Sequence, residues 1–158
     1  MTRKKLAALV LGAALTLSSA VCAASVPSDQ LSLGGIEYGM TEDTVRSIYG
    51  TPTDTEYKQS QHYNGTAVQF EYGDNFEVTL VDGIVRSIEA EERSDQATPA
   101  GIQVGMSVAT LKDVYGEPDI IRGNKYIYRC DDDSSLGLVF EIRMDKIDEI
   151  AVGTLKYR

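Results

Sequence analysis

The stretch Gly101-Ile102-Gln103-Val104-Gly105-Met106-Ser107 leads through a short apolar pattern to Tyr115-Gly116 and Pro118. An earlier stretch, Gly35-Ile36-Glu37-Tyr38-Gly39-Met40-Thr41, matches it and leads to Tyr49-Gly50 and Pro52. The offset is 66 residues throughout, since 101 − 35 and 118 − 52 are equal. A match at a fixed offset predicts an internal repeat.

Each copy has the pattern of a short capped helix. Thr41 and Ser107 offer hydroxyl oxygens to the free N–H groups of a first helical turn. Gly50 and Gly116 favour helix termination, and a proline follows each glycine two residues later. Between these signals, apolar residues recur at the spacing of a hydrophobic staple and of one helix face. The apolar residues are Met40, Val45, Ile48 and Tyr49 in the first copy and Met106, Leu111, Val114 and Tyr115 in the second.

Alternating apolar and polar residues follow each helix and predict antiparallel strands, with turns at Asn64-Gly65, Asp82-Gly83 and Asp145-Lys146. The predicted strands are 56–63, 66–72, 76–80, 84–92, 125–130, 136–144 and 147–156. The expected fold class is α+β. It is a tandem repeat of a short helix followed by an antiparallel meander, with the helices packed on one face of a sheet of roughly seven to eight strands. The two units are 25–98 and 99–158, and whether they share one sheet is left open.

Residues 1–24 have the pattern of a signal peptide. Arg3, Lys4 and Lys5 precede an apolar run of about twelve residues, which is short for a membrane span. Small residues follow, so cleavage is expected near Ala23 or Ala24. The protein is therefore predicted to be periplasmic or secreted. Alternatively, Cys22 is the acylated cysteine of a lipoprotein.

The mature chain is strongly acidic. The whole chain has 15 Lys and Arg, of which the three in the signal segment are removed, leaving 12 against 24 Asp and Glu and a formal charge of −12. Such a charge argues against binding to nucleic acid or anionic lipid and favours a basic protein partner or a solubilising surface. Cys130 is the cysteine that remains, so no internal disulfide is expected.

No catalytic, cofactor or metal site is predicted. His62 lacks ligand partners at metal-binding spacing, and Asp131-Asp132-Asp133 lacks the spacing of a calcium loop. Cys130 has no histidine or orienting group near it in sequence, so a nucleophilic role is not expected. The alternative is a hydrolase that uses scattered carboxylates, which would require two of them to converge in a deep pocket.

The solvent-facing side of the predicted sheet is the candidate binding surface. Alternation places one set of polar residues outward, and tyrosines on flanking strands extend it; Tyr and Arg are common anchors of protein interfaces. The candidate residues are Gln69, Glu71, Glu77, Thr79, Arg129, Glu141, Arg143, Tyr63 and Tyr126.

The pattern of Gly-Met-Thr/Ser, an apolar staple, Tyr-Gly-x-Pro and a meander, in tandem, resembles the repeats of the β-lactamase inhibitor protein family. One unit is also similar to the BamE/SmpA small outer-membrane lipoproteins. The first resemblance implies an exported, non-enzymatic module that grips a protein or peptide partner with an open sheet face. The second implies, as an alternative, a scaffold for assembly of the cell envelope.

Overall fold

The computed structural model describes residues 25–60 and 65–155, and these residues are mostly sheet. The predicted signal peptide with Cys22, and the residues His62 and Tyr63, lie outside the described ranges. The helices are η1 (Ser28–Gln30), α1 (Glu42–Tyr49) and α2 (Val108–Tyr115). The strands are β1 (Ser32–Leu33), β2 (Ile36–Glu37), β3 (Asp54–Ser60), β4 (Gly65–Glu71), β5 (Phe76–Val81), β6 (Ile84–Ala90), β7 (Ile120–Arg122), β8 (Lys125–Arg129), β9 (Leu136–Arg143) and β10 (Lys146–Thr154).

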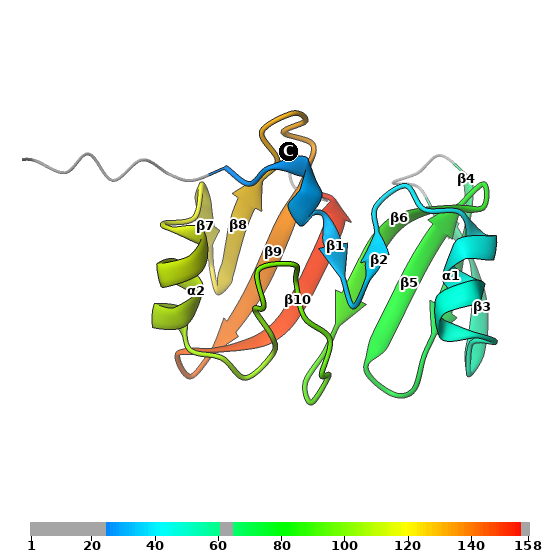
Figure 1. The fold of residues 1–158 in the computed structure, drawn as a ribbon, viewed down its shortest axis with the longest axis horizontal. Helices are drawn as coiled ribbons and strands as arrows, with labels where there is room; N and C mark the ends of the chain where they lie inside the picture. The colour runs from blue at the N-terminus through cyan, green and yellow to red at the C-terminus, as the bar shows by residue number, and fades with distance from the viewer. Residues whose placement is uncertain (1–24, 61–64, 156–158) are drawn as a thin grey trace, which may run out of the picture.

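Strands β3 to β10 form one continuous antiparallel sheet, in the order β3-β4-β5-β6-β10-β9-β8-β7 (Figure 1). The two halves of the chain meet at its centre, where Ile88 on β6 lies opposite Val152 on β10. Strands β1 and β2 form a separate antiparallel pair. The two halves of the chain therefore share one sheet. They are joined by the β6–β10 pairing, which brings together residues about sixty positions apart in the chain.

The predicted fold class is wrong. The described chain is mostly sheet and is not a tandem repeat of helix-plus-meander units in which packed helices form the layer over one face. It has ten strands in two antiparallel sheets, and α1 and α2 have eight residues each. A helix of that length is about 12 Å long. Eight strands span about 34 Å at a spacing of about 4.8 Å, so the two helices are too short to cover the sheet.

The centre of the sheet is covered instead by the β1–β2 pair and by the segment 91–107. Figure 1 shows both lying in front of β6 and β10, with α1 and α2 towards opposite ends of the sheet. Leu33, Ile36 and Ile102, which come from these covering segments, are all 1% exposed or less. Burial of three large aliphatic side chains stabilises the fold by several kcal/mol, roughly 2 kcal/mol for each.

The predicted helix ends are confirmed. Thr44 N donates to the Thr41 hydroxyl at 3.4 Å, and Thr110 N donates to the Ser107 hydroxyl at 3.1 Å. Gly50 and Gly116 follow the last helical residues with positive φ. The predicted apolar stripe is only partly right, because Ile48 and Val114 are 49% and 44% exposed. Val45 and Leu111 are fully buried, so the buried face of each helix is narrower than the predicted stripe.

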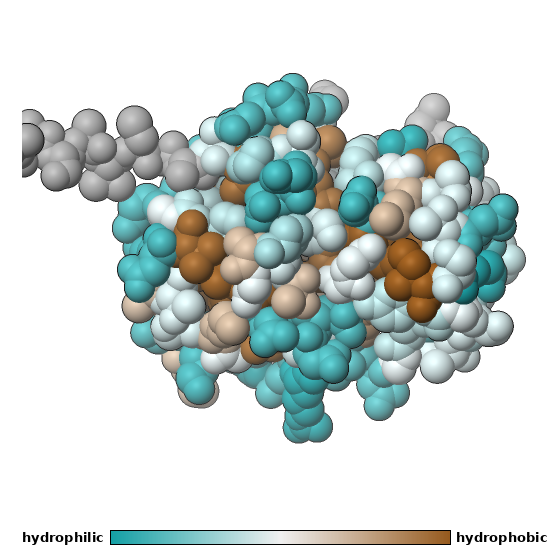
Figure 2. All heavy atoms as spheres, in the orientation of Figure 1, coloured by the Kyte–Doolittle hydropathy of each residue, from teal (hydrophilic) through white to brown (hydrophobic). Residues whose placement is uncertain are grey.

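Most predicted strands are present, with three differences, one of which is that the β1–β2 pair was not predicted. The turn between β9 and β10 lies at Met144 and Asp145, which both have positive φ, one residue earlier than expected. Strand β7 was not predicted, because its three residues are too short to show alternation. The surface that carries the helices has several small hydrophobic areas among polar ones (Figure 2). No helix among the described residues is long and apolar enough to cross a membrane.

Candidate functional site

The candidate site lies on the face of the eight-stranded sheet opposite α1 and α2, which we call the open face. The register assigns residues to it, because directly opposed residues in antiparallel strands share a face. Val78, Ile88 and Phe140 belong to the main core on the helical side, so the residues that alternate with them face the other way. On this face no helix of the described residues lies over the sheet.

Five glutamates cross the open face, and we call them the carboxylate row: Glu71, Glu77, Glu89, Glu149 and Glu141. Glu77 lies directly opposite both Glu71 on β4 and Glu89 on β6. On the next strands Glu149 lies opposite Glu141. All five side chains are half-buried. Like charges in directly opposed positions destabilise a sheet, so this row raises the free energy of the isolated protein.

The neighbours of the row alter its protonation. Burial is the main cause and repulsion from Glu89 the second cause that raise the pKa of Glu77 to about 7. Burial and then Glu89 also raise the pKa of Glu149. At the other end, hydrogen bonds from Lys125 and Asn124 lower the pKa of Glu141, and the Lys125 ammonium lies 2.8 Å from the Glu141 carboxylate. The row therefore has a repulsive middle and a neutralised end.

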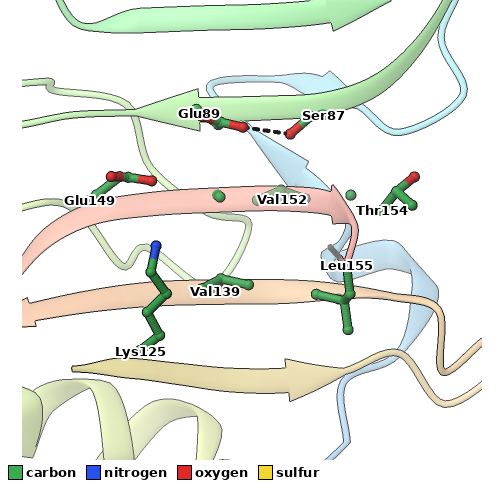
Figure 3. Close-up of a pocket in the computed structure, with 11 residues that line it drawn as sticks. Ser87, Glu89, Lys125, Val139, Glu149, Val152, Thr154 and Leu155 are labelled. Carbon is green, nitrogen blue, oxygen red and sulfur yellow. Dashed lines mark hydrogen bonds between the residues drawn. The ribbon is translucent and has the colours of Figure 1, made fainter. Parts of the chain in front are cut away.

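A shallow hollow of about 70 Å³ lies beside the middle of the row, over β6, β10, β9 and β8. Figure 3 shows Glu89 and Ser87 at one side and Lys125 at the other, with Glu149 between them. The Ser87 hydroxyl donates to Glu89 at 2.9 Å. Gly137 and Gly153 line the hollow and face each other across β9 and β10, so that two strands carry no side chain there.

Glycine is required at both positions. A Cβ atom at residue 137 would collide with the carbonyl oxygen of Tyr128, and one at residue 153 would collide with that of Arg86. Gly153 also has a φ of +125°, which L side chains rarely adopt. The hollow thus exists because neighbouring strands approach too closely there to admit a side chain.

A small apolar cluster adjoins the hollow. Ile127, Val139 and Leu155 are buried together, with Ile120 and Ala151 packed against them. Leu155 follows β10 and reaches this cluster from the end of the described chain. The half of the open face over β7 to β10 is therefore partly apolar, and the half over β3 to β6 is polar and acidic.

The structure brings six of the predicted site residues onto the open face: Gln69, Glu71, Glu77, Thr79, Arg129 and Glu141. Gln69 accepts a hydrogen bond from Lys58, and Glu77 accepts one from Thr79 at 3.4 Å. Arg143 lies at the end of β9, where it pairs with Asp148 at 2.6 Å and Glu92 at 3.5 Å. It borders a separate hollow of about 480 Å³ with Met144 and Arg93.

Tyr126 does not lie with the other predicted residues. It packs against the main core on the helical side, with the Lys112 ammonium 5.7 Å from its ring centroid. Alternation explains this placement, since residues 126 and 129 are three apart on one strand and so face opposite ways. Tyr63 lies outside the described residues.

Sequence reasoning missed Glu89, Glu149 and Lys125 as members of the site. Glu89 lies on β6 between the buried Ile88 and Ala90, so alternation turns it outward, but it was not among the candidate residues. Glu149 was hidden by a register shift in β10 between Ile147 and Glu149, which breaks the alternation. Lys125 was within reach of the alternation rule, because it lies four residues from Arg129 on the predicted strand 125–130 and therefore shares its face.

The arrangement suits charge recognition better than chemistry on a small molecule. The hollow beside the carboxylate row, with about 70 Å³, is much smaller than the roughly 300–1,000 Å³ typical of small-molecule sites. Within the described residues, no group of three or more His, Cys, Asp or Glu side chains could hold a metal ion. Cys130 is 3% exposed in the main core, so burial separates its thiol from solvent.

Comparison with known proteins gives no family. No family model matches the chain, and no curated protein matches it. Among solved structures, a cysteine-rich secretory protein from Staphylococcus aureus subsp. aureus Mu50 is similar with a TM-score of 0.49 and 11% sequence identity. The similarity covers 84% of this chain and 49% of that one, so this chain spans about half the length of that protein.

Proposed function

We propose that the protein is an exported, non-enzymatic binding module whose open face binds a basic segment of a protein partner. The observation that carries this proposal is the carboxylate row on a sheet face over which no helix of the described residues lies. Three of its members, Glu71, Glu77 and Glu89, oppose one another across consecutive strands. A cationic partner would relieve this repulsion, so association gains energy that the isolated protein lacks.

The shape of the face supports a macromolecular partner. The hollow beside the row is shallow and has about 70 Å³ of space, whereas the row extends over five strands from β4 to β9. An extended basic segment can contact such a row at several points, and long-range attraction by a strongly acidic protein speeds its arrival. The envelope-scaffold alternative remains a prediction from sequence resemblance.

A lysine-rich peptide is the probe for a first test, with binding measured by calorimetry at low and high salt. We expect Glu71→Lys to weaken binding about tenfold, because it places a cation in the row. The matched control is Asp113→Lys, an exposed position on α2 with the same change of charge. Equal weakening by both variants would show that the peptide senses only net charge and would overturn the proposal.

The native partner is then sought with a photo-crosslinker at Thr79, which lies next to the row on β5. Crosslinking in the intact cell envelope should capture one protein through a Lys- or Arg-rich segment, and Glu71→Lys should abolish that product. Capture that persists in Glu71→Lys, or a captured segment without basic residues, would contradict recognition through the row.

A further inference from the structure

Strand β3 is an outer strand of the sheet and pairs with β4 on one side only. Its seven residues, Asp54–Ser60, make it one of the longer strands of the molecule. On the other side no strand of the described residues pairs with it. The Thr55 N–H donates to the Asp54 carboxylate at 2.8 Å. A seven-residue edge strand whose other outward N–H and C=O groups meet no neighbouring strand of the described residues is a template for another extended chain.

The side chains of β3 differ from those of a protected edge. Tyr57 is 73% exposed, an unusual degree for a large aromatic ring. The neighbouring Glu56 and Lys58 side chains are 55% and 47% exposed and form an ion pair at 3.1 Å. Charged side chains often protect an edge strand from pairing. Here Glu56 and Lys58 have opposite signs on either side of Tyr57, so a second copy of the same edge can complement them.

We propose that two copies of this chain associate by antiparallel pairing of β3 with β3, about a twofold axis at Tyr57. In this register Glu56 of each copy lies opposite Lys58 of the other, so two opposite-charge pairs form on the open face. The two Tyr57 rings meet on the helical face. Such an interface is isologous, as expected for a symmetric dimer.

The charges also select this register over its neighbours. A shift of two residues in one direction places Glu56 opposite its own copy, and a shift in the other direction does the same for Lys58. Both alternatives bring like charges together, which destabilises strand pairing. The first also sets Asp54 of each copy opposite Lys58 of the other, so attraction and repulsion compete there, whereas the proposed register has opposite-charge pairs without a like-charge pair. A shift of one residue sets Glu56 against Tyr57 and turns the helices of the two copies to opposite faces.

The helices leave room for this pairing. Helix α1 packs over β4 and β5, because Arg46 stacks on Phe70 and Tyr49 contacts Phe76. In the dimer the two β4 strands would be about 14 Å apart, which is three strand spacings. A helix with its side chains is about 10 Å wide, so both α1 helices fit on the same face.

Charge variants test the pairing, using protein purified after expression of the full-length gene and sedimentation measured over a range of concentrations. The parent protein should form a concentration-dependent dimer. Glu56→Lys alone and Lys58→Glu alone should each raise the dimer dissociation constant about tenfold, because each places like charges in opposition. An equimolar mixture of these two variants should form a heterodimer, because each chain then meets opposite charges at both positions.

The mixture is the decisive arm, since restored association shows that both variants are folded. Lys146→Glu, an exposed position at the start of β10, is the control for net charge and should leave the dimer unchanged. The proposal is overturned if the parent protein is monomeric at all concentrations, if either single variant dimerises as the parent does, or if the mixture stays monomeric. None of these outcomes depends on the carboxylate row or its partner.

Discussion

Glu77 is the residue whose pKa shows most clearly how the sheet register brings like charges together. It is half-buried between Glu71 and Glu89, and its pKa is about 7 in the folded protein against an ordinary value of 4.5. A carboxyl whose pKa is raised by folding binds more protons in the folded state. Between about pH 4.5 and 7 the protein therefore loses stability as the pH rises, and above 7 the loss is complete.

Glu77→Gln should remove this pH dependence. We expect the variant to be more stable than the parent by about 1–2 kcal/mol near pH 8 and about equal to it near pH 4, after allowance for solvent screening of a half-buried group. Urea unfolding at the two pH values measures the difference. Glu141→Gln is the control of opposite sign, because Lys125 lowers the pKa of Glu141 and its carboxylate is stabilising. Equal stability of Glu77→Gln and parent near pH 8 would contradict the prediction.

Residue identity alone predicted part of the site. Strict alternation predicted that Gln69, Glu71, Glu77 and Thr79 share the outward face, and they do so because β4 and β5 pair without interruption in this region. The same rule would have excluded Tyr126 once Arg129 was placed on the open face. Glu149 was beyond its reach, because the register shift in β10 reverses the alternation at one point and leaves no mark in the residue types.

At the scale of elements, the two helices show how local sequence signals become structure. Thr41 and Ser107 cap α1 and α2 as predicted, and Gly50 and Gly116 end them. These signals are reliable because a helix end needs a hydrogen-bond acceptor and then a residue that tolerates positive φ. Strand β7 and the β1–β2 pair escaped prediction, since two or three residues have no measurable period and form only against the rest of the molecule.

Removal of the two N-cap hydroxyls should lower the free energy of unfolding by unequal amounts. Ser107→Ala should lower the free energy of unfolding by about 1 kcal/mol, because it leaves the Thr110 N–H unsatisfied. Thr41→Ala should cost less, because its bond to Thr44 N is longer, 3.4 Å against 3.1 Å. Urea unfolding measures both, with Ser107→Thr and Thr41→Ser as controls that keep a hydroxyl. A larger loss for Thr41→Ala than for Ser107→Ala would contradict this order.

At the scale of the whole molecule, the repeat in the sequence did not predict the fold. Matching contacts do exist locally: Gly39 N donates to Val85 O and Gly105 N donates to Ile147 O, at 3.0 and 2.8 Å. These pairs fix each helix start to its strand. The architecture depends instead on the β6–β10 pairing and on the central cover by Leu33, Ile36 and Ile102. Long-range pairing of this kind depends on which chain segments meet, which no short motif records.

The β6–β10 junction should make the two halves of the sheet unfold together. Gly153 lies at this junction with a φ of +125°, and a Cβ there would collide with the Arg86 carbonyl oxygen on β6. We expect Gly153→Ala to lower the free energy of unfolding by about 2–4 kcal/mol, from backbone strain and from displacement of β6. Because both halves share one core, hydrogen-exchange protection should fall equally in β5 and β8.

Gly35→Ala is the matched control for that measurement. Gly35 also has positive φ, +78°, but nothing lies within 4 Å of the Cβ position, so only the backbone strain of about 1–2 kcal/mol applies. Urea unfolding gives the difference between the two variants, and hydrogen exchange locates it. If Gly153→Ala costs no more than Gly35→Ala, the close approach of β6 and β10 is not a source of stability. If exchange accelerates in β8 and β9 but stays slow in β4 and β5, the halves are separate folding units and the central pairing does not couple them.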